Sequence, residues 1–209
     1  MSEVNAEWVT QRGCIMRALI LDIDGTLVKP DIDWTYVRRR LSELGINVPH
    51  KPVAEILARV AMHNPKLAKS VEDEIVGIER RSAERVRRDP ELRGLLLQFK
   101  DRGIRIAVVT LRGRETAAKV LGSLGISDLV DVLVTREDSY DRRVQLRTVL
   151  SALGVEPSQT YFLGDTMWDL EAGKNEGVNV LLIDSKEDPV STVPKHLKAT
   201  LRKLLENLQ

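Results

Sequence analysis

The stretch ALILDIDGT, residues 18–26, is the part of the sequence that says most about the fold. A short apolar run that ends in a carboxylate is typical of a buried parallel strand, which brings the residues after it to the carboxyl edge of a sheet. Asp22 and Asp24 follow the run, and Gly25 permits a tight turn that would direct both carboxylates inward. One acid of such a pair can attack an electrophile while the other transfers protons. Taken alone, the pair is also compatible with a surface turn.

Further short apolar runs are predicted to form strands at residues 104–110, 130–135, 161–165 and 179–184. Helical patterns are found at residues 90–102, 115–124, 143–153, 168–175 and 194–208. This alternation predicts an α/β fold, a Rossmann-like parallel sheet with helices on both faces. Ligands bind such sheets at the carboxyl ends of the strands, so we expect Asp22, Thr110 and Asp165 to meet at one edge.

One segment interrupts the alternation. Helical patterns at residues 33–44, 53–62 and 67–88 follow one another without a strand signal. We therefore predict a small all-helical cap over residues 31–89, inserted after the first strand and placed over the edge where the acids gather. The catalytic core is predicted to comprise residues 16–30 and 90–209. Residues 1–15 are predicted to be an N-terminal extension, unless translation starts at Met16, and they lack the apolar core of a secretory signal.

Composition excludes several classes of protein. The net charge of +1 over 209 residues does not favour a general nucleic-acid binder, which usually carries a basic excess. No apolar run is long enough to cross a bilayer, so we expect no membrane partner. Cys14 is the single cysteine, which rules out an intrachain disulfide and fits a reducing compartment, so a cytoplasmic location is predicted. The sequence leaves the oligomeric state open.

The acidic residues at the predicted sheet edge indicate a metal ion. Asp165 is followed four residues later by Asp169, and together with Asp22 and Asp24 these carboxylates would repel one another strongly without a cation. Hard oxygen ligands of this type suit Mg²⁺, which also binds phosphate. The hydroxyl of Thr110 could then hydrogen-bond a phosphoryl oxygen. The sequence thus predicts a magnesium site that handles a phosphate group.

The motifs DIDGTL (residues 22–27), VVT (108–110) and GDTMWD (164–169) together resemble those of the haloacid dehalogenase superfamily. Their order and spacing match, and the resemblance covers nearly all of residues 16–209. The helical insert resembles the cap of the phosphoglycolate phosphatase-like branch. The resemblance implies a Mg²⁺-dependent phosphatase that acts on a small phosphorylated metabolite.

The resemblance also implies a role for each matching residue. Asp22 would be the nucleophile that takes the phosphoryl group. Asp24 would protonate the leaving alcohol and then activate water, and Thr110 would hydrogen-bond the transferred group. Asp22, Asp165 and the backbone carbonyl of Asp24 would bind Mg²⁺, and Asp169 would complete or support the metal shell.

The sequence departs from the family pattern in one important place. A lysine usually precedes the helix before the fourth strand, but residues 139–145 read SYDRRVQ and contain none. Arg142 or Arg143 is expected to replace it and bind phosphate, because a guanidinium also pairs with phosphate and carboxylates. We favour Arg142. The alternative is that both are solvated residues at a helix start. Thr110 is also followed by Leu111, where the family often has asparagine.

Other functions on the same fold remain open at this stage. Dehalogenase chemistry does not need the second acid of the first motif, so Asp24 argues against it. A phosphomutase of the β-phosphoglucomutase type uses the same motifs and differs in how its cap excludes water. A non-catalytic regulatory or binding protein is supported only by the missing lysine. The sequence does not name the phosphate ester.

Overall fold

The computed structural model describes residues 16–29, 34–47, 53–184 and 192–208, so the predicted extension at residues 1–15 lies outside the described residues. Its centre is a five-stranded parallel sheet in the order β3-β2-β1-β4-β5. The strands are β1 (Ala18–Leu21), β2 (Arg105–Val109), β3 (Val132–Val134), β4 (Thr160–Gly164) and β5 (Asn179–Leu182). The predicted parallel sheet is confirmed. The strand that carries the first acidic motif, β1, lies at its centre.

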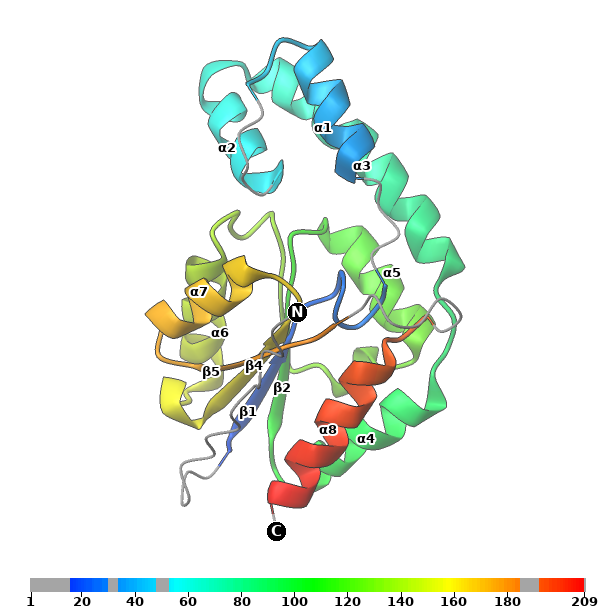
Figure 1. Ribbon diagram of the computed structural model, residues 1–209, viewed down its shortest axis with the longest axis vertical. Helices are drawn as coiled ribbons and strands as arrows, with labels where there is room; N and C mark the ends of the chain where they lie inside the picture. The colour runs from blue at the N-terminus through cyan, green and yellow to red at the C-terminus, as the bar shows by residue number, and fades with distance from the viewer. Residues whose placement is uncertain (1–15, 30–33, 48–52, 185–191, 209) are drawn as a thin grey trace, which may run out of the picture.

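Helices cover both faces of the sheet (Figure 1). One face packs against α4 (Pro90–Asp101), α5 (Arg114–Leu124) and α8 (Lys195–Asn207), and the other against α6 (Arg142–Leu153) and α7 (Met167–Asn175). Short 3-10 turns, η1 (Ser127–Leu129) and η2 (Pro157–Gln159), precede β3 and β4.

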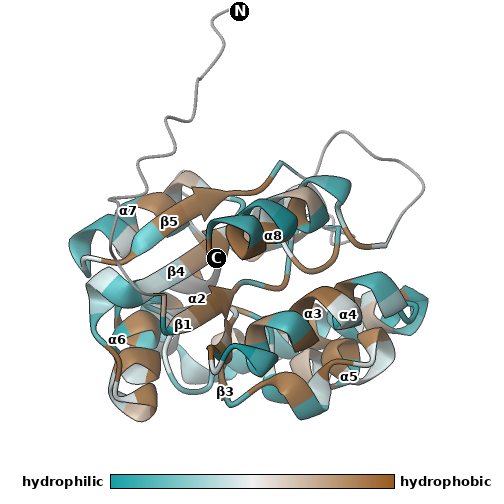
Figure 2. Ribbon diagram, turned by 90° about the horizontal axis from the view of Figure 1, so that it is seen from below, coloured by the Kyte–Doolittle hydropathy of each residue, from teal (hydrophilic) through white to brown (hydrophobic). Residues whose placement is uncertain are grey.

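The two faces of β1 show why the sheet needs both helical layers. Leu19 and Leu21 belong to the cluster that contains Leu96 of α4, while Ile20 belongs to the cluster that contains Leu146 of α6. All these side chains are fully buried, which is typical of a parallel strand covered on both faces. Figure 2 shows brown and teal residues on the flanking helices, as expected of amphipathic helices that cover an apolar sheet.

The segment after β1 forms α1 (Trp34–Glu43), α2 (Val53–His63) and α3 (Pro65–Arg85). These helices lie beyond one end of the sheet, away from α4 and α8 (Figure 1). They have a hydrophobic cluster of their own, which comprises Val37, Leu41, Val53, Ile56, Val71 and Ile75. We call α1–α3 the cap. A domain boundary at residues 31–89 stays a prediction.

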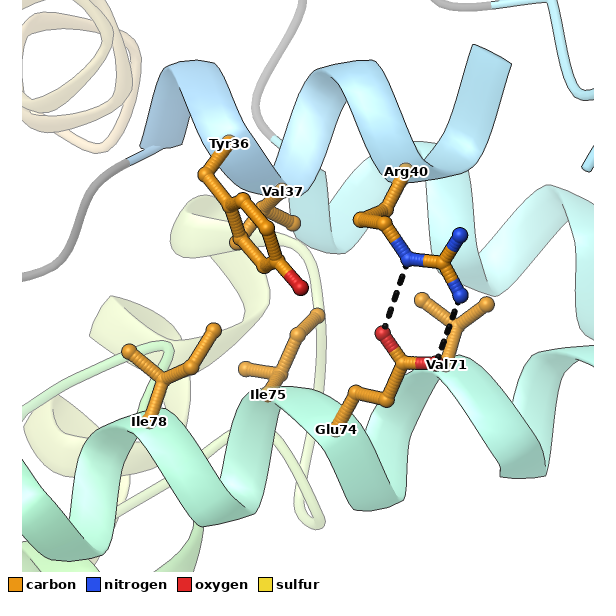
Figure 3. Close-up of a pocket in the computed structure, with 7 residues that line it drawn as sticks. All are labelled: Tyr36, Val37, Arg40, Val71, Glu74, Ile75 and Ile78. Carbon is orange, nitrogen blue, oxygen red and sulfur yellow. Dashed lines mark hydrogen bonds and ion pairs between the residues drawn. The ribbon is translucent and has the colours of Figure 1, made fainter. Parts of the chain in front are cut away.

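A small hollow lies within the cap, between α1 and α3 (Figure 3). It is lined by Tyr36, Val37, Arg40, Val71, Glu74, Ile75 and Ile78. Arg40 donates to Glu74 across it, with Nη2 3.3 Å from Oε1. The acidic residues of the sheet edge do not contribute to this hollow, so the chemistry must be sought elsewhere.

The cap contacts the rest of the chain mainly through α3, which packs against α5. Arg80, from the basic run on α3, donates two hydrogen bonds to Glu115 of α5, at 3.1 and 2.8 Å. Lys119 of α5 pairs with Glu84 at 3.2 Å. These side chains are largely exposed. At these positions the charged face of α3 therefore serves as a salt-bridged surface.

Candidate active site

The turn after β1 brings the first acidic motif to the carboxyl edge of the sheet. Gly25 has a φ of 82°, and its N–H donates to the Val28 carbonyl at 2.7 Å. A Cβ at Gly25 would overlap the carboxylate of Asp165. The position therefore requires glycine twice over, once for its left-handed backbone and once because an acid from β4 occupies the space a side chain would take.

Three carboxylates from two strand ends form the centre of the site. Asp22, Asp165 and Asp169 each offer an oxygen atom within 4.8 Å of the others. Burial, with added repulsion from Asp169 and Asp165, holds the pKa of Asp22 well above its ordinary value, although Arg142 opposes this shift. Burial and the charges of Asp169 and Asp24 raise the pKa of Asp165 to about 7. Such a group is strained electrostatically, and its all-oxygen donor set fits Mg²⁺.

Arg142 is the cation that reaches this centre. Its Nη2 lies 2.9 Å from Oδ1 of Asp22, and its Nε lies 2.9 Å from Oδ1 of Asp169. The guanidinium also lies 5.9 Å from the centroid of the Phe162 ring. Burial lowers the pKa of Arg142, but the charges of Asp22 and Asp169 outweigh this and hold it above its ordinary value. The arginine therefore stays charged among the acids.

Arg143 does not join the group, although it is the next residue along α6. Its Nη2 pairs with Asp141 at 3.3 Å, and half of its side chain is exposed. Asp141 also caps α6 by accepting from the Arg143 backbone N–H at 2.8 Å. The expectation that Arg143 binds phosphate finds no support in this geometry, because its side chain pairs with Asp141 at the start of its own helix and is half exposed.

Asp169 is held in place by the start of α7. Its Oδ2 accepts from the backbone N–H of Thr166 at 3.1 Å and from the Thr166 hydroxyl at 2.6 Å, forming a capping box. A Cβ at Gly164 would crowd this carboxylate. Because Oδ1 pairs with Arg142, both oxygens of Asp169 already have protein partners, which suits a residue that supports a metal shell.

Thr110 lies fully buried at the end of β2, as its position in the sequence predicted. Its hydroxyl accepts from the backbone N–H of Arg112 at 3.1 Å. Gln145 of α6, also buried, donates to the Thr110 carbonyl at 2.9 Å and accepts from Nη1 of Arg142 at 2.9 Å. Gln145 thus joins the end of β2 to the arginine. Sequence reasoning missed it, although its i+3 spacing from Arg142 on a helix was a usable signal.

Asp24 has a partner that sequence reasoning also missed. Arg112, two residues after Thr110, donates from Nε to both carboxylate oxygens of Asp24, at 3.0 and 2.8 Å. Its Nη2 adds a third bond to Oδ1 at 2.7 Å. The side chain of Asp24 is outside the group of three carboxylates described above. The carboxylate of Asp24 is therefore engaged by Arg112, and the backbone carbonyl of Asp24 stays the atom of this residue that is predicted to bind the metal.

The acids and the arginine at the carboxyl edge of the sheet define a class of protein, and a comparison with known families identifies it. A protein-family model described as haloacid dehalogenase-like hydrolase matches residues 16–177, and the chain belongs to that family. Two phosphoglycolate phosphatases of this family align with about four fifths of the chain, in agreement with the branch that the sequence resembles. No helix among those described is both long and apolar enough to cross a membrane.

The individual relatives described next share about a third of their aligned residues with this chain, or fewer. The phosphoglycolate phosphatase of Aquifex aeolicus (strain VF5) is 28% identical over 179 residues, which cover 80% of this chain and 84% of the relative. The pyrophosphatase PpaX of Halalkalibacterium halodurans is 33% identical over 86 residues, 40% of each chain. The β-phosphoglucomutase of Clostridium difficile has the same fold, with a TM-score of 0.59 and 16% identity, over 92% of this chain and 100% of that one.

Proposed function

We propose that this protein is a Mg²⁺-dependent phosphatase that hydrolyses a small-molecule phosphate monoester through an aspartyl-phosphate on Asp22. One observation supports this most strongly. The buried carboxylate of Asp22 lies against a buried guanidinium and shares its surroundings with Asp165 and Asp169. A nucleophile, a fixed positive charge and an oxygen-donor metal site are the elements that phosphoryl transfer requires.

Each residue has a defined part in the proposed reaction. The Asp22 carboxylate attacks phosphorus, the P–O bond to the alcohol breaks, and Asp24 gives its proton to the departing oxygen. Water then attacks the acyl-phosphate and loses its proton to Asp24, so that inorganic phosphate leaves and Asp22 is regenerated. Throughout, Arg142 offsets negative charge, and the hydroxyl of Thr110 donates to a phosphoryl oxygen.

The proposed metal ligands are Asp22, Asp165 and the backbone carbonyl of Asp24, supported by Asp169. Bound Mg²⁺ would neutralise charge on the phosphoryl oxygens and orient the group for in-line displacement. The donors fit this ion, since all are oxygen atoms, and the carboxylates of Asp22, Asp165 and Asp169 lie within 4.8 Å of one another, where a cation relieves their repulsion.

The relatives favour one substrate class over its rivals. The phosphoglycolate phosphatase of Aquifex aeolicus aligns over most of both chains, whereas the pyrophosphatase PpaX aligns over 40% of each. We therefore favour a monoester of a small metabolite over pyrophosphate. A phosphomutase remains the second candidate, since β-phosphoglucomutase has this fold. The case for a non-catalytic protein rests on the missing lysine, and the buried Arg142 weakens it, because its guanidinium lies 2.9 Å from Asp22 and offers the positive charge that a lysine would supply.

The test begins with Asp22→Asn, because an amide cannot form the acyl-phosphate. Phosphate release from 4-nitrophenyl phosphate, phosphoglycolate and pyrophosphate should be measured with Mg²⁺ for the unaltered protein and the variant. Asp73→Asn, an exposed acid on α3, is the matched control and should keep full activity. Substantial turnover by purified Asp22→Asn would contradict the covalent mechanism. With a sugar phosphate as an additional substrate, release of phosphate rather than formation of an isomerised sugar phosphate separates a phosphatase from a mutase.

A further inference from the structure

Arg112 connects the second acid of the first motif to the cap. Its side chain is almost completely buried, and its guanidinium holds both oxygens of Asp24. On its other side, Nη2 donates to Oγ of Ser82 at 3.0 Å and Nη1 donates to the Glu79 carbonyl at 3.3 Å. Ser82 and Glu79 both belong to α3. One guanidinium thus bridges the turn after β1 and the helix that anchors the cap.

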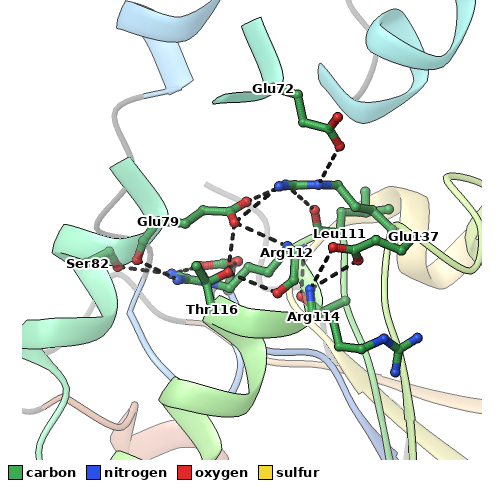
Figure 4. A network of polar contacts seen from close by, with 12 residues as sticks. Glu72, Glu79, Ser82, Leu111, Arg112, Arg114, Thr116 and Glu137 are labelled. Carbon is green, nitrogen blue, oxygen red and sulfur yellow. Dashed lines mark hydrogen bonds and ion pairs between the residues drawn. The ribbon is translucent and has the colours of Figure 1, made fainter. Parts of the chain in front are cut away.

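A buried polar network holds α3 against the loop after β2 that carries Arg112 and against the start of α5 (Figure 4). The carboxylate of Glu79, which is fully buried, accepts from the backbone N–H of Gly113 at 3.2 Å and from the hydroxyl of Thr116 at 2.8 Å. Arg136, from the loop after β3, donates to Glu79 at 2.5 Å and pairs with Glu72 at 3.3 Å. Because these groups are buried and mutually bonded, α3 cannot shift relative to the sheet without changing them.

The contacts of Arg112 are selective. Among the described residues, its side chain bonds Asp24 and α3 but none of the three carboxylates around the proposed metal. Oδ1 of Asp24 accepts two of the bonds and Oδ2 accepts one, so the Oδ2 edge retains capacity for proton transfer. Two-pronged pairing of this kind fixes the plane of a carboxylate as well as its location.

We propose that Arg112 is a positioning residue that fixes Asp24 for proton transfer and makes its placement depend on the seating of cap helix α3. This inference rests on the proposed role of Asp24 as acid and base. A general acid works only within hydrogen-bond reach of the departing oxygen, so its orientation directly affects the rate. A shift of α3 when substrate binds would therefore change the position of the Asp24 carboxylate, through Ser82 and the Arg112 guanidinium.

The test compares two substrates of nearly equal size, phenyl phosphate and 4-nitrophenyl phosphate, in single-turnover measurements with Mg²⁺. Nitrophenolate leaves without a proton, whereas phenolate leaves more readily when it receives one. Asp24→Asn should lower the rate on phenyl phosphate by about 10²–10⁴-fold and affect 4-nitrophenyl phosphate much less. Arg112→Met should show the same selectivity, with a loss of about 10–100-fold on phenyl phosphate.

The link to the cap is tested by Ser82→Ala, which removes one acceptor from Arg112 and leaves Asp24 untouched. We expect a loss of about two- to fivefold, again confined to phenyl phosphate, because Arg112 loses one hydrogen bond to α3 and keeps its other partners. The matched controls are Arg114→Met, an exposed arginine at the start of α5, and Ser70→Ala, an exposed serine of α3. Both should behave like the unaltered protein.

A double-mutant cycle separates positioning from simple structural support. If Arg112 acts through Asp24, adding Arg112→Met to Asp24→Asn should change the rate by less than about twofold. Additive losses, or equal losses on both substrates, would overturn the proposal. Arg112→Lys, which keeps a charge but cannot pair with both oxygens in one plane, should regain part of the selectivity and remains informative if Arg112→Met does not fold.

The single variants separate a failure of the acid role of Asp24 from a failure of the positioning role of Arg112. Equal losses for Asp24→Asn on the two substrates would overturn the acid role itself, and with it this inference. A selective loss for Asp24→Asn that Arg112→Met and Ser82→Ala both fail to reproduce would overturn only the positioning role of Arg112.

Discussion

Replacing Arg142 by methionine tests the electrostatic core of the proposed mechanism. Methionine keeps most of the aliphatic length, but it removes the guanidinium that lies over the Phe162 ring and bridges Asp22 and Asp169 at 2.9 Å each. Removing a preorganised partner of a developing negative charge typically lowers kcat by about 10²–10³-fold, or about 2.7–4 kcal/mol. We expect a loss of that size in phosphate release for Arg142→Met.

Arg143→Met is the matched control, because the two arginines are adjacent and differ in what they contact. Among the described residues Arg143 forms its ion pair with Asp141 of the preceding turn, and its side chain is half exposed. Loss of an exposed pair has little effect, so activity should stay within about twofold of the unaltered protein. Arg142→Lys should keep part of the activity if a point charge suffices and lose most of it if both contacts are needed.

Stability must be measured beside activity, since Arg142 is buried. Leaving two buried carboxylates without their cation can cost about 3–5 kcal/mol. Thermal unfolding with and without Mg²⁺ therefore accompanies the assay, and rates are compared only where each variant is folded. If folded Arg142→Met and Arg143→Met both retain full activity, the idea that Arg142 replaces the usual lysine is wrong. Arg38 of the cap would be the next cation to test.

Two further predictions concern the metal site. Excess chelator should stop phosphate release and Mg²⁺ should restore it, with Ca²⁺ a poor substitute because it prefers more ligands and looser geometry. Full activity in excess chelator would remove the metal from the mechanism. Asp165→Ala should weaken Mg²⁺ binding, measured by calorimetry, more than it lowers the unfolding temperature. Gly25→Ala should weaken Mg²⁺ binding by about 10–100-fold by displacing Asp165. Gly103→Ala has a similar positive φ but open space around it, so it should destabilise the fold without changing Mg²⁺ affinity, and equal Mg²⁺ affinities for the two variants would refute the steric argument.

The sheet was predictable because its signals are local. Each strand is a short run that is apolar on both faces, and β1 between β2 and β4 is a strand whose side chains are all buried. Asp22, Thr110 and Asp165 follow three such strands, so parallel pairing necessarily brings them to one edge. The two-residue spacing of Asp22 and Asp24 predicted that both acids face this edge, and in the structure Asp22 joins the group of three carboxylates while Asp24 pairs with Arg112.

The sequence by itself determined the order of the strands along the chain, the helical segment after β1, and the acids that gather at the sheet edge. It left open which of two adjacent arginines enters the site. Neighbouring residues on a helix point about 100° apart, so the packing of α6 against the sheet selects Arg142 and turns Arg143 outward. Arg112 meets α3 across 30 residues of sequence, and no local pattern encodes that contact. Periodicity and motifs report what a residue does within its own element, whereas partners from separate elements are decided only when those elements pack.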